Sequence, residues 1–231
     1  MTPSHSPTTP ASSTGLILLC KRPALGHSKQ RLAAEIGQQA AWRIAERLLQ
    51  CALEDLAAWP GAQIIAPDAE QHLAWAGQLC PQALAIAQAD GNLGQRINRL
   101  DQHLRGLGNT RLIFIGSDCP QLHEQHLLKA AQLLHSHDSV LFPASDGGVV
   151  LMASRRPWPD LSELPWSTAQ LGAALADACR QAGHAVIEAD LLEDIDHWQD
   201  LQRAQAHLAG DTRPARAALL ASLDTIDHAQ R

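Results

Sequence analysis

Short apolar runs alternate with longer amphipathic stretches along most of the chain, and this alternation strongly constrains its fold. Apolar runs of strand length lie at residues 15–20, 63–66, 83–87, 111–116, 139–143, 149–153 and 185–188. Stretches with helical spacing lie mostly between them, at residues 38–59, 69–79, 95–107, 123–135, 167–181 and 197–208. Buried strands joined by helices predict an α/β fold, in which a mostly parallel central sheet lies between two helical layers.

The pattern occupies residues 15–209 without a linker or repeat, which predicts a single domain. Residues 1–14 are rich in Ser, Thr and Pro, and we predict a disordered leader there. Residues 210–231 are predicted to form a polar, partly helical tail. The chain has no tyrosine, which excludes any mechanism that needs a phenol as acid, base or nucleophile.

The net charge and the positions of the cysteines exclude several classes of protein. The net charge of -6 argues against a nucleic-acid partner, which normally requires a basic surface. No apolar run approaches the roughly 20 residues of a membrane span, and the N-terminus lacks the features of a signal peptide. The five cysteines are scattered and form no C-x-x-C pair, so we predict a cytoplasmic protein without a disulfide framework. The oligomeric state stays open.

A basic loop follows the first predicted strand. In parallel sheets the ligand crevice lies at the carboxyl ends of the strands, so the loops after residues 20, 116 and 143 should converge. Backbone N–H groups and cationic side chains in such a loop suit phosphate groups. The alternative is a solvated loop without a ligand. The candidate residues are Lys21, Arg22, Gly26, Lys29 and Arg31.

Carboxylates follow the central and last strands. Asp118 comes directly after the strand at 111–116, where it could bind Mg²⁺ or Mn²⁺ or could cap the next helix. Asp194 and Asp196 alternate ahead of the last helix. They could share a cation, or simply complement the helix dipole.

Two further segments combine turn residues with groups that could contact a ligand. Gly147 and Gly148 make a turn between strands, and the open question is whether Asp146 also faces the site. Trp166 lies in an irregular segment and could stack on a base or sugar, or serve packing. Residues 167–170 fit a capping box that would open the helix at 167–181.

Six motifs in one order resemble a bacterial family of GT-A-like glycosyltransferases. That family was formerly a domain of unknown function. Its members are also labelled radical-SAM/selenodomain-associated or arsenosugar-biosynthesis transferases. The first motif, at residues 21–32, resembles the family's K-x-P-x-x-G-x-x-K-T-R-L. The others are Asp90–Arg96, Ile115–Leu122, Pro143–Gly148, Leu164–Thr168 and Asp194–Asp196. The resemblance covers roughly residues 15–205 and departs from the pattern at Gln30, in place of Thr, and Val149, in place of Tyr.

The resemblance implies a nucleotide-diphospho-sugar transferase fold, GT-A-like and Rossmann-like, with Mg²⁺ or Mn²⁺ as cofactor. Asp118 resembles the carboxylate that holds the metal, with Asp196 as a further ligand, and Asp118 and Asp146 are the catalytic candidates. Binding of the nucleotide and substrate would involve the basic loop together with Gly94, Arg96, Gly147, Gly148 and Trp166.

The function that follows is transfer from a nucleotide-activated donor, a nucleotide sugar, to a small-molecule acceptor. Two alternatives remain. One is a nucleotidylyltransferase that releases pyrophosphate from a nucleoside triphosphate. The other is a non-catalytic nucleotide-binding module.

Overall fold

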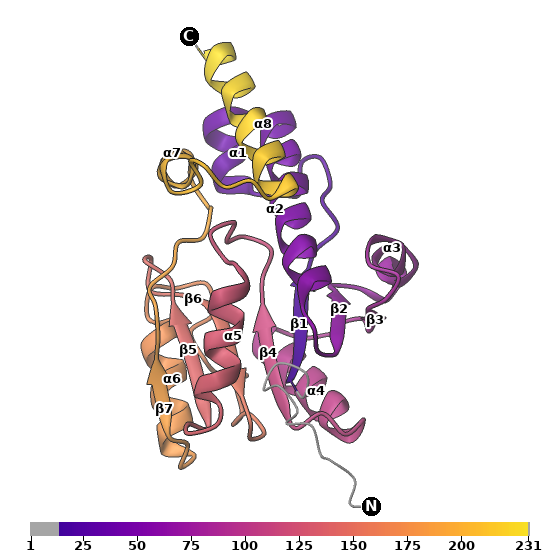
Figure 1. Ribbon diagram of the computed structural model, residues 1–231, viewed down its shortest axis with the longest axis vertical. Coiled ribbons are helices and arrows are strands. Elements are labelled where there is room, and N and C mark those ends of the chain that lie inside the picture. Colours follow the sequence, from indigo (N-terminus) through magenta and orange to yellow (C-terminus); the bar gives the residue numbers. More distant parts are fainter. Residues whose placement is uncertain (1–13, 231) are drawn as a thin grey trace, which may run out of the picture.

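Seven strands form the central sheet, in the order β3-β2-β1-β4-β6-β5-β7 (Figure 1). The structure is a computed structural model that describes residues 14–230. The leader predicted at residues 1–14 lies outside the described residues, apart from Thr14. Each predicted apolar run forms a strand: β1 Thr14–Cys20, β2 Gln63–Pro67, β3 Leu84–Ala85, β4 Arg111–Ile115, β5 Ser139–Pro143, β6 Val149–Ser154 and β7 Val186–Glu188.

Six of these strands run in one direction, and β6 runs antiparallel to its neighbours β4 and β5. The reason is the length of the connections. Only the turn at residues 144–148 separates β5 from β6, whereas parallel neighbours need a crossover of a dozen or more residues. The predicted α/β fold with a mostly parallel central sheet is confirmed.

Helices cover both faces of the sheet. Alternate residues of β1 point to opposite faces, so Leu16 and Leu18 pack in one apolar cluster while Ile17 packs in another. The first cluster includes residues of α2 (Gln38–Ala58), α3 (Leu73–Leu79) and α5 (Glu124–Leu133). A short 3-10 helix, η2 (Glu70–His72), leads into α3. The opposite cluster includes residues of α4 (Leu93–Gly106) and α6 (Leu171–Gln181).

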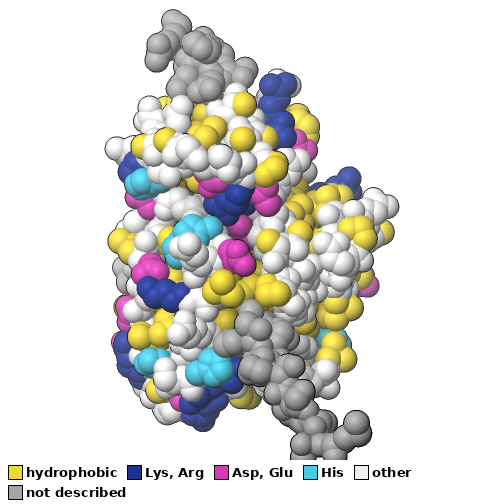
Figure 2. Space-filling view, in the orientation of Figure 1, with side chains coloured by type: hydrophobic (Ala, Val, Ile, Leu, Met, Phe, Trp, Pro, Cys, Tyr) yellow, Lys and Arg dark blue, Asp and Glu magenta, His cyan; other side chains and the backbone are white. Residues whose placement is uncertain are grey.

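A third apolar cluster lies beyond the end of the sheet to which β1 points. It joins α1 (Gln30–Ile36), α7 (Trp198–His207) and α8 (Pro214–Gln230) to residues 41–51 of α2. We call these helices the helical cap (Figure 1). Figure 2 shows charged and histidine side chains gathered in a band between this cap and the body below it. None of the helices in residues 14–230 is long and apolar enough to cross a membrane.

Two local predictions differ from the structure. Helix α1 begins at Gln30, inside the segment that the sequence presented as a polar loop. Helix α6 begins at Leu171 rather than 167, and no side chain caps it. Ser167 has φ of 64°, whereas an N-cap residue needs extended backbone, so the predicted capping box does not form. Thr168 instead donates its hydroxyl hydrogen to the carbonyl of Pro165 at 2.8 Å.

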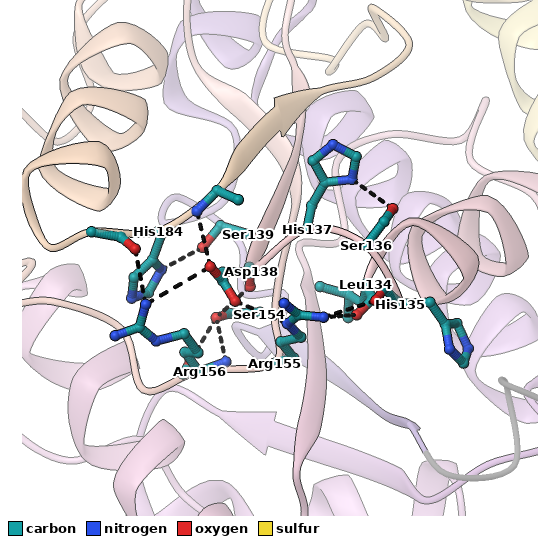
Figure 3. Close-up of polar contacts among 12 residues, drawn as sticks. Leu134, His135, Ser136, His137, Asp138, Ser139, Ser154, Arg155, Arg156 and His184 are labelled. Carbon is teal, nitrogen blue, oxygen red and sulfur yellow. Dashed lines mark hydrogen bonds and ion pairs between the residues drawn. The ribbon is translucent and has the colours of Figure 1, made fainter.

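A polar cluster ties β5, β6 and β7 together at the amino edge of the sheet (Figure 3). The carboxylate of Asp138 accepts hydrogen bonds from Arg155 Nε and the Ala185 N–H, each at 2.9 Å. These donors, the Ala185 N–H foremost, hold the pKa of Asp138 below its usual value. His184 Nδ1 lies 2.8 Å from the hydroxyl of Ser139, which is fully buried. The hydrogen bonds of this cluster hold the ends of β5, β6 and β7 together.

Candidate functional site

Lys29 lies at the centre of a polar cluster beyond the carboxyl ends of β1 and β4. Its Nζ is 3.0 Å from Asp118 Oδ2 and 3.2 Å from Asp196 Oδ1, and it also donates to the carbonyl of Ile195. The Lys29 side chain is only 8% exposed. Burial alone would lower the pKa of Lys29, but the two carboxylates outweigh it and the pKa lies above its ordinary value. The ammonium therefore stays charged at neutral pH.

Asp118 joins two loops. Its carbonyl accepts the Ile195 N–H at 2.9 Å, which fixes the segment after β4 against the segment before α7. Its carboxylate also accepts the Ser117 hydroxyl at 3.3 Å. The Asp118 side chain is 47% exposed, so a ligand can reach it from solvent.

The cationic side chains of the basic loop lie in different surroundings. Arg31 donates to Asp196 Oδ2 at 2.8 Å and so joins Lys29 in the carboxylate cluster. Arg22 instead lies over the ring of Trp75 on α3, 6.0 Å from its centroid. Lys21 is exposed. Gly26 has φ of 77°, which allows the tight turn that brings Lys29 back to the sheet.

The Arg22 guanidinium borders an open cavity of about 1080 Å³ between α2, α3 and the end of α8. Trp42 and Trp75 are among its lining residues. The structure therefore places Arg22 in a different environment from Lys29 and Arg31, although sequence reasoning grouped them.

Asp146 belongs to a second pair of carboxylates. Burial, and then the charges of Asp146 and Asp196, raise the pKa of Asp194 to about 6. Asp146 Oδ1 accepts the Gly148 N–H at 2.8 Å, which shapes the turn between β5 and β6. Sequence reasoning noticed Asp194 but did not select it as a site residue. The signal was its alternation with Asp196.

Gly147 and Gly94 are required by close packing within the chain. A Cβ on Gly147 would lie 2.1 Å from the carbonyl oxygen of Ala169, and Gly147 also has φ of 91°. A Cβ on Gly94 would lie 1.9 Å from the carbonyl oxygen of Leu161. Gly94 therefore lets Leu161 lie directly on α4, and Gly147 lets Ala169 lie directly on the β5–β6 turn.

Trp166 and Arg96 bind the protein's own backbone. Trp166 Nε1 donates to the carbonyl of Leu161 at 2.8 Å, and the ring packs against an apolar cluster of the core. Arg96 Nε donates to the carbonyl of Gly91 at 2.8 Å. These contacts correspond to the packing alternative for Trp166, and ligand contacts by either residue stay predictions.

The four carboxylates Asp118, Asp146, Asp194 and Asp196 offer oxygen ligands alone, which is the chemistry that Mg²⁺ and Mn²⁺ prefer. Residues 14–230 contain no group of three or more Asp, Glu, His or Cys side chains arranged to hold a metal by themselves. Mg²⁺ is commonly bound by one or two carboxylates together with substrate phosphates, so the donor set fits a metal shared with a phosphorylated ligand.

Comparison with known families decides the identity of the chain. Residues 48–168 match the family described as "Uncharacterized protein conserved in bacteria (DUF2064)". The chain belongs to this family. The resemblance drawn from the six motifs is thereby confirmed. No curated protein matches the chain.

Solved structures confirm the fold. A Desulfovibrio desulfuricans G20 protein, provisionally described as a nucleotide-diphospho-sugar transferase, is 25% identical with a TM-score of 0.84, covering 93% of this chain and 96% of its own. A cytidylyltransferase from Leptospira borgpetersenii is 10% identical with a TM-score of 0.56, covering 95% of each chain. A nucleotidyl transferase from Methanothermobacter is 14% identical with a TM-score of 0.53, covering 85% of this chain and 98% of its own. The DUF2064 chain thus has the nucleotide-diphospho-sugar transferase fold.

Proposed function

We propose that this protein is a metal-dependent transferase that uses a nucleotide-activated donor, a nucleotide sugar, and a small-molecule acceptor. The observation that carries the proposal is the cluster of Lys29, Asp118 and Asp196 beyond the carboxyl ends of the strands. The proposal is supported by the likeness, over 93% of the chain, to a protein provisionally described as a nucleotide-diphospho-sugar transferase.

Each group has a role that follows from its charge. Asp118 and Asp196 would hold Mg²⁺ or Mn²⁺, which would neutralise the diphosphate as it leaves the sugar. Lys29 and Arg31 contact these carboxylates already and would complement the phosphate oxygens. Asp146 lies on the β5–β6 turn. Its carboxylate would orient the hydroxyl group of the acceptor or accept a proton from it. Positioning and charge stabilisation, rather than covalent catalysis, would accelerate the reaction.

We also propose a reducing compartment, the cytoplasm, for this protein. All five cysteines are free, and four of them are buried. Burial raises the pKa of Cys20, Cys51 and Cys119 to about 12, so these thiols stay protonated, and Cys20 and Cys51 act as small core residues.

The decisive experiment is a thermal-shift panel of nucleotide sugars and nucleoside triphosphates with Mg²⁺, Mn²⁺ or chelator. A ligand present at 100 times its Kd should raise Tm by about 5–10 °C for a domain of this size. We expect the shift to need the metal and to vanish in Asp118→Asn. Asp177→Asn, which alters an exposed carboxylate on α6, serves as the matched control and should keep it.

The products then identify the reaction. Release of a nucleoside diphosphate supports sugar transfer, whereas release of pyrophosphate from a triphosphate would show nucleotidylyl transfer instead. Binding of every donor without turnover would contradict an enzymatic role. A full metal-dependent shift in Asp118→Asn would refute the assignment of that carboxylate.

A further inference from the structure

Arg216 on α8 is a fully buried cation at the junction of the helical cap and the sheet. Its guanidinium contacts the carboxylates of Glu54, at 2.9 Å, and Asp55, both on α2. It also donates to the carbonyl of Cys51 at 2.6 Å. Two carboxylates thus offset the charge, and the remaining donors are free to bind backbone oxygens.

Two further backbone oxygens that Arg216 binds belong to the segment that carries Asp118. Arg216 Nε donates to the carbonyl of Pro120 at 3.2 Å, and its Nη2 donates to the carbonyl of Leu122 at 2.9 Å. Arg213, one turn earlier, also donates to the carbonyl of Leu122, at 3.0 Å. Asp118 is two residues from the first of these carbonyls, and its own carbonyl accepts the Ile195 N–H.

We propose that Arg216 is a positioning residue, which fixes the segment at residues 118–122 so that the Asp118 carboxylate meets its ligand in one geometry. The planar guanidinium reaches acceptors on α2 and on the Asp118 segment at the same time, which a lysine ammonium cannot do from one point. The C-terminal helix, which the sequence presents as part of a polar tail, is thereby part of the machinery around the site. The proposal rests on the role of Asp118 in the proposed function.

The positioning role of Arg216 can be distinguished from a general role in docking α8, because other residues of the helix dock it through different contacts. The helix also packs through Leu219, which is fully buried in the cap cluster with residues of α2 and α7. Leu219 therefore anchors the same helix without being among the contacts of the Pro120 and Leu122 carbonyls. Leu219→Ala is the matched control, because it weakens the docking of α8 and leaves the guanidinium in place.

The test compares Arg216→Lys with Leu219→Ala by two measurements on the full chain. The first is hydrogen exchange at the amides of Leu122 and Ile195, which bond to the carbonyls of Cys119 and Asp118. The second is titration with MnCl2. In Arg216→Lys we expect exchange at both amides to rise at least about ten-fold, and the Mn²⁺ affinity to fall about ten-fold. In Leu219→Ala the Mn²⁺ affinity should stay within about two-fold of the wild type, and exchange at the two amides should rise less than in Arg216→Lys.

Equal changes in the two variants would overturn the proposal, because loosening of the cap would then explain them. Unchanged exchange at Leu122 and Ile195 in Arg216→Lys would overturn it as well. If Arg216→Lys does not fold, Asp55→Asn serves instead, because it removes one carboxylate that holds the guanidinium. Amide exchange should then rise and Mn²⁺ affinity should fall, each by less than in Arg216→Lys. Unchanged Mn²⁺ affinity in Asp118→Asn would instead refute the proposed function, and the exchange measurement would still decide the role of Arg216.

Discussion

Replacement of Lys29 by methionine tests whether the Lys29 ammonium competes with a metal ion for the carboxylates of the site. In the structure the Lys29 ammonium lies 3.0 Å from Asp118 and 3.2 Å from Asp196, so it competes with any cation for the same carboxylate oxygens. Two unit charges 4 Å apart interact by about 4 kcal/mol at an effective dielectric constant of 20 and about 1 kcal/mol in bulk water. The carboxylate side chains are 47% and 34% exposed, which favours the lower part of that range.

We therefore expect Lys29→Met to bind Mn²⁺ more tightly by about 1–2 kcal/mol, or roughly 5–30-fold. Binding of pyrophosphate at saturating Mn²⁺ should weaken about ten-fold, because a phosphate loses its cationic partner. The free energy of unfolding should fall by about 1–2 kcal/mol, since two partly solvated carboxylates lose their ion pair.

Isothermal titration with MnCl2, and then with pyrophosphate, measures both effects. Lys129→Met is the control, because Lys129, in the middle of α5, pairs with Asp190 in a more exposed ion pair that does not involve Asp118 or Asp196. Its affinities should equal those of the wild type. Unchanged or weaker Mn²⁺ binding in Lys29→Met would refute competition between the ammonium and the metal.

For three further substitutions we predict the direction in which the stability of the protein changes. Gly147→Ala should lower the free energy of unfolding by about 2–4 kcal/mol in urea, because its Cβ meets the Ala169 carbonyl; Gly37→Ala, with positive φ but no neighbour within 4 Å, should cost less. Asp138→Asn should lower Tm at pH 7. Since the folded pKa of Asp138 is lowered, its stabilisation exists above the unfolded pKa of about 4 and is lost below it, so the two Tm curves should converge in acid. Asp194→Asn should raise Tm at pH 7, because a pKa raised to about 6 means that ionisation opposes folding as the pH rises from about 4 to 6; an unchanged Tm would contradict this.

The strands were predictable because each is a local property of the chain. An apolar run of strand length that is bounded by turns can be buried on both faces only in a sheet covered by helices. The position of Asp118 at the end of β4 follows from the same pattern. The order of the strands was not predicted, because pairing depends on contacts between distant segments. The reversal of β6 was not predicted either, although its cause is local, the short turn at residues 144–148.

Other features could not be predicted because they depend on contacts between segments that are distant in the sequence. Residues 30–36 are mostly good helix formers, but a helix of seven residues is marginal by itself, and α1 forms with Leu32 buried against α2, α7 and α8. Trp166 and Gly94 stay predicted ligand contacts, and the structure adds that both pack against the carbonyl of Leu161. Such roles appear only when the partner segments are in place.

The sequence by itself determined the α/β fold, the edge of the sheet where polar groups gather, and the family. Hydrophobic periodicity and local motifs contain that information. Only the tertiary structure decided which charges meet. It placed Lys29 between Asp118 and Asp196, and it buried Arg216 against Pro120 and Leu122. The physical reason is that the energy of a charge depends on its burial and its nearest partners, and both are set by segments far away in the chain.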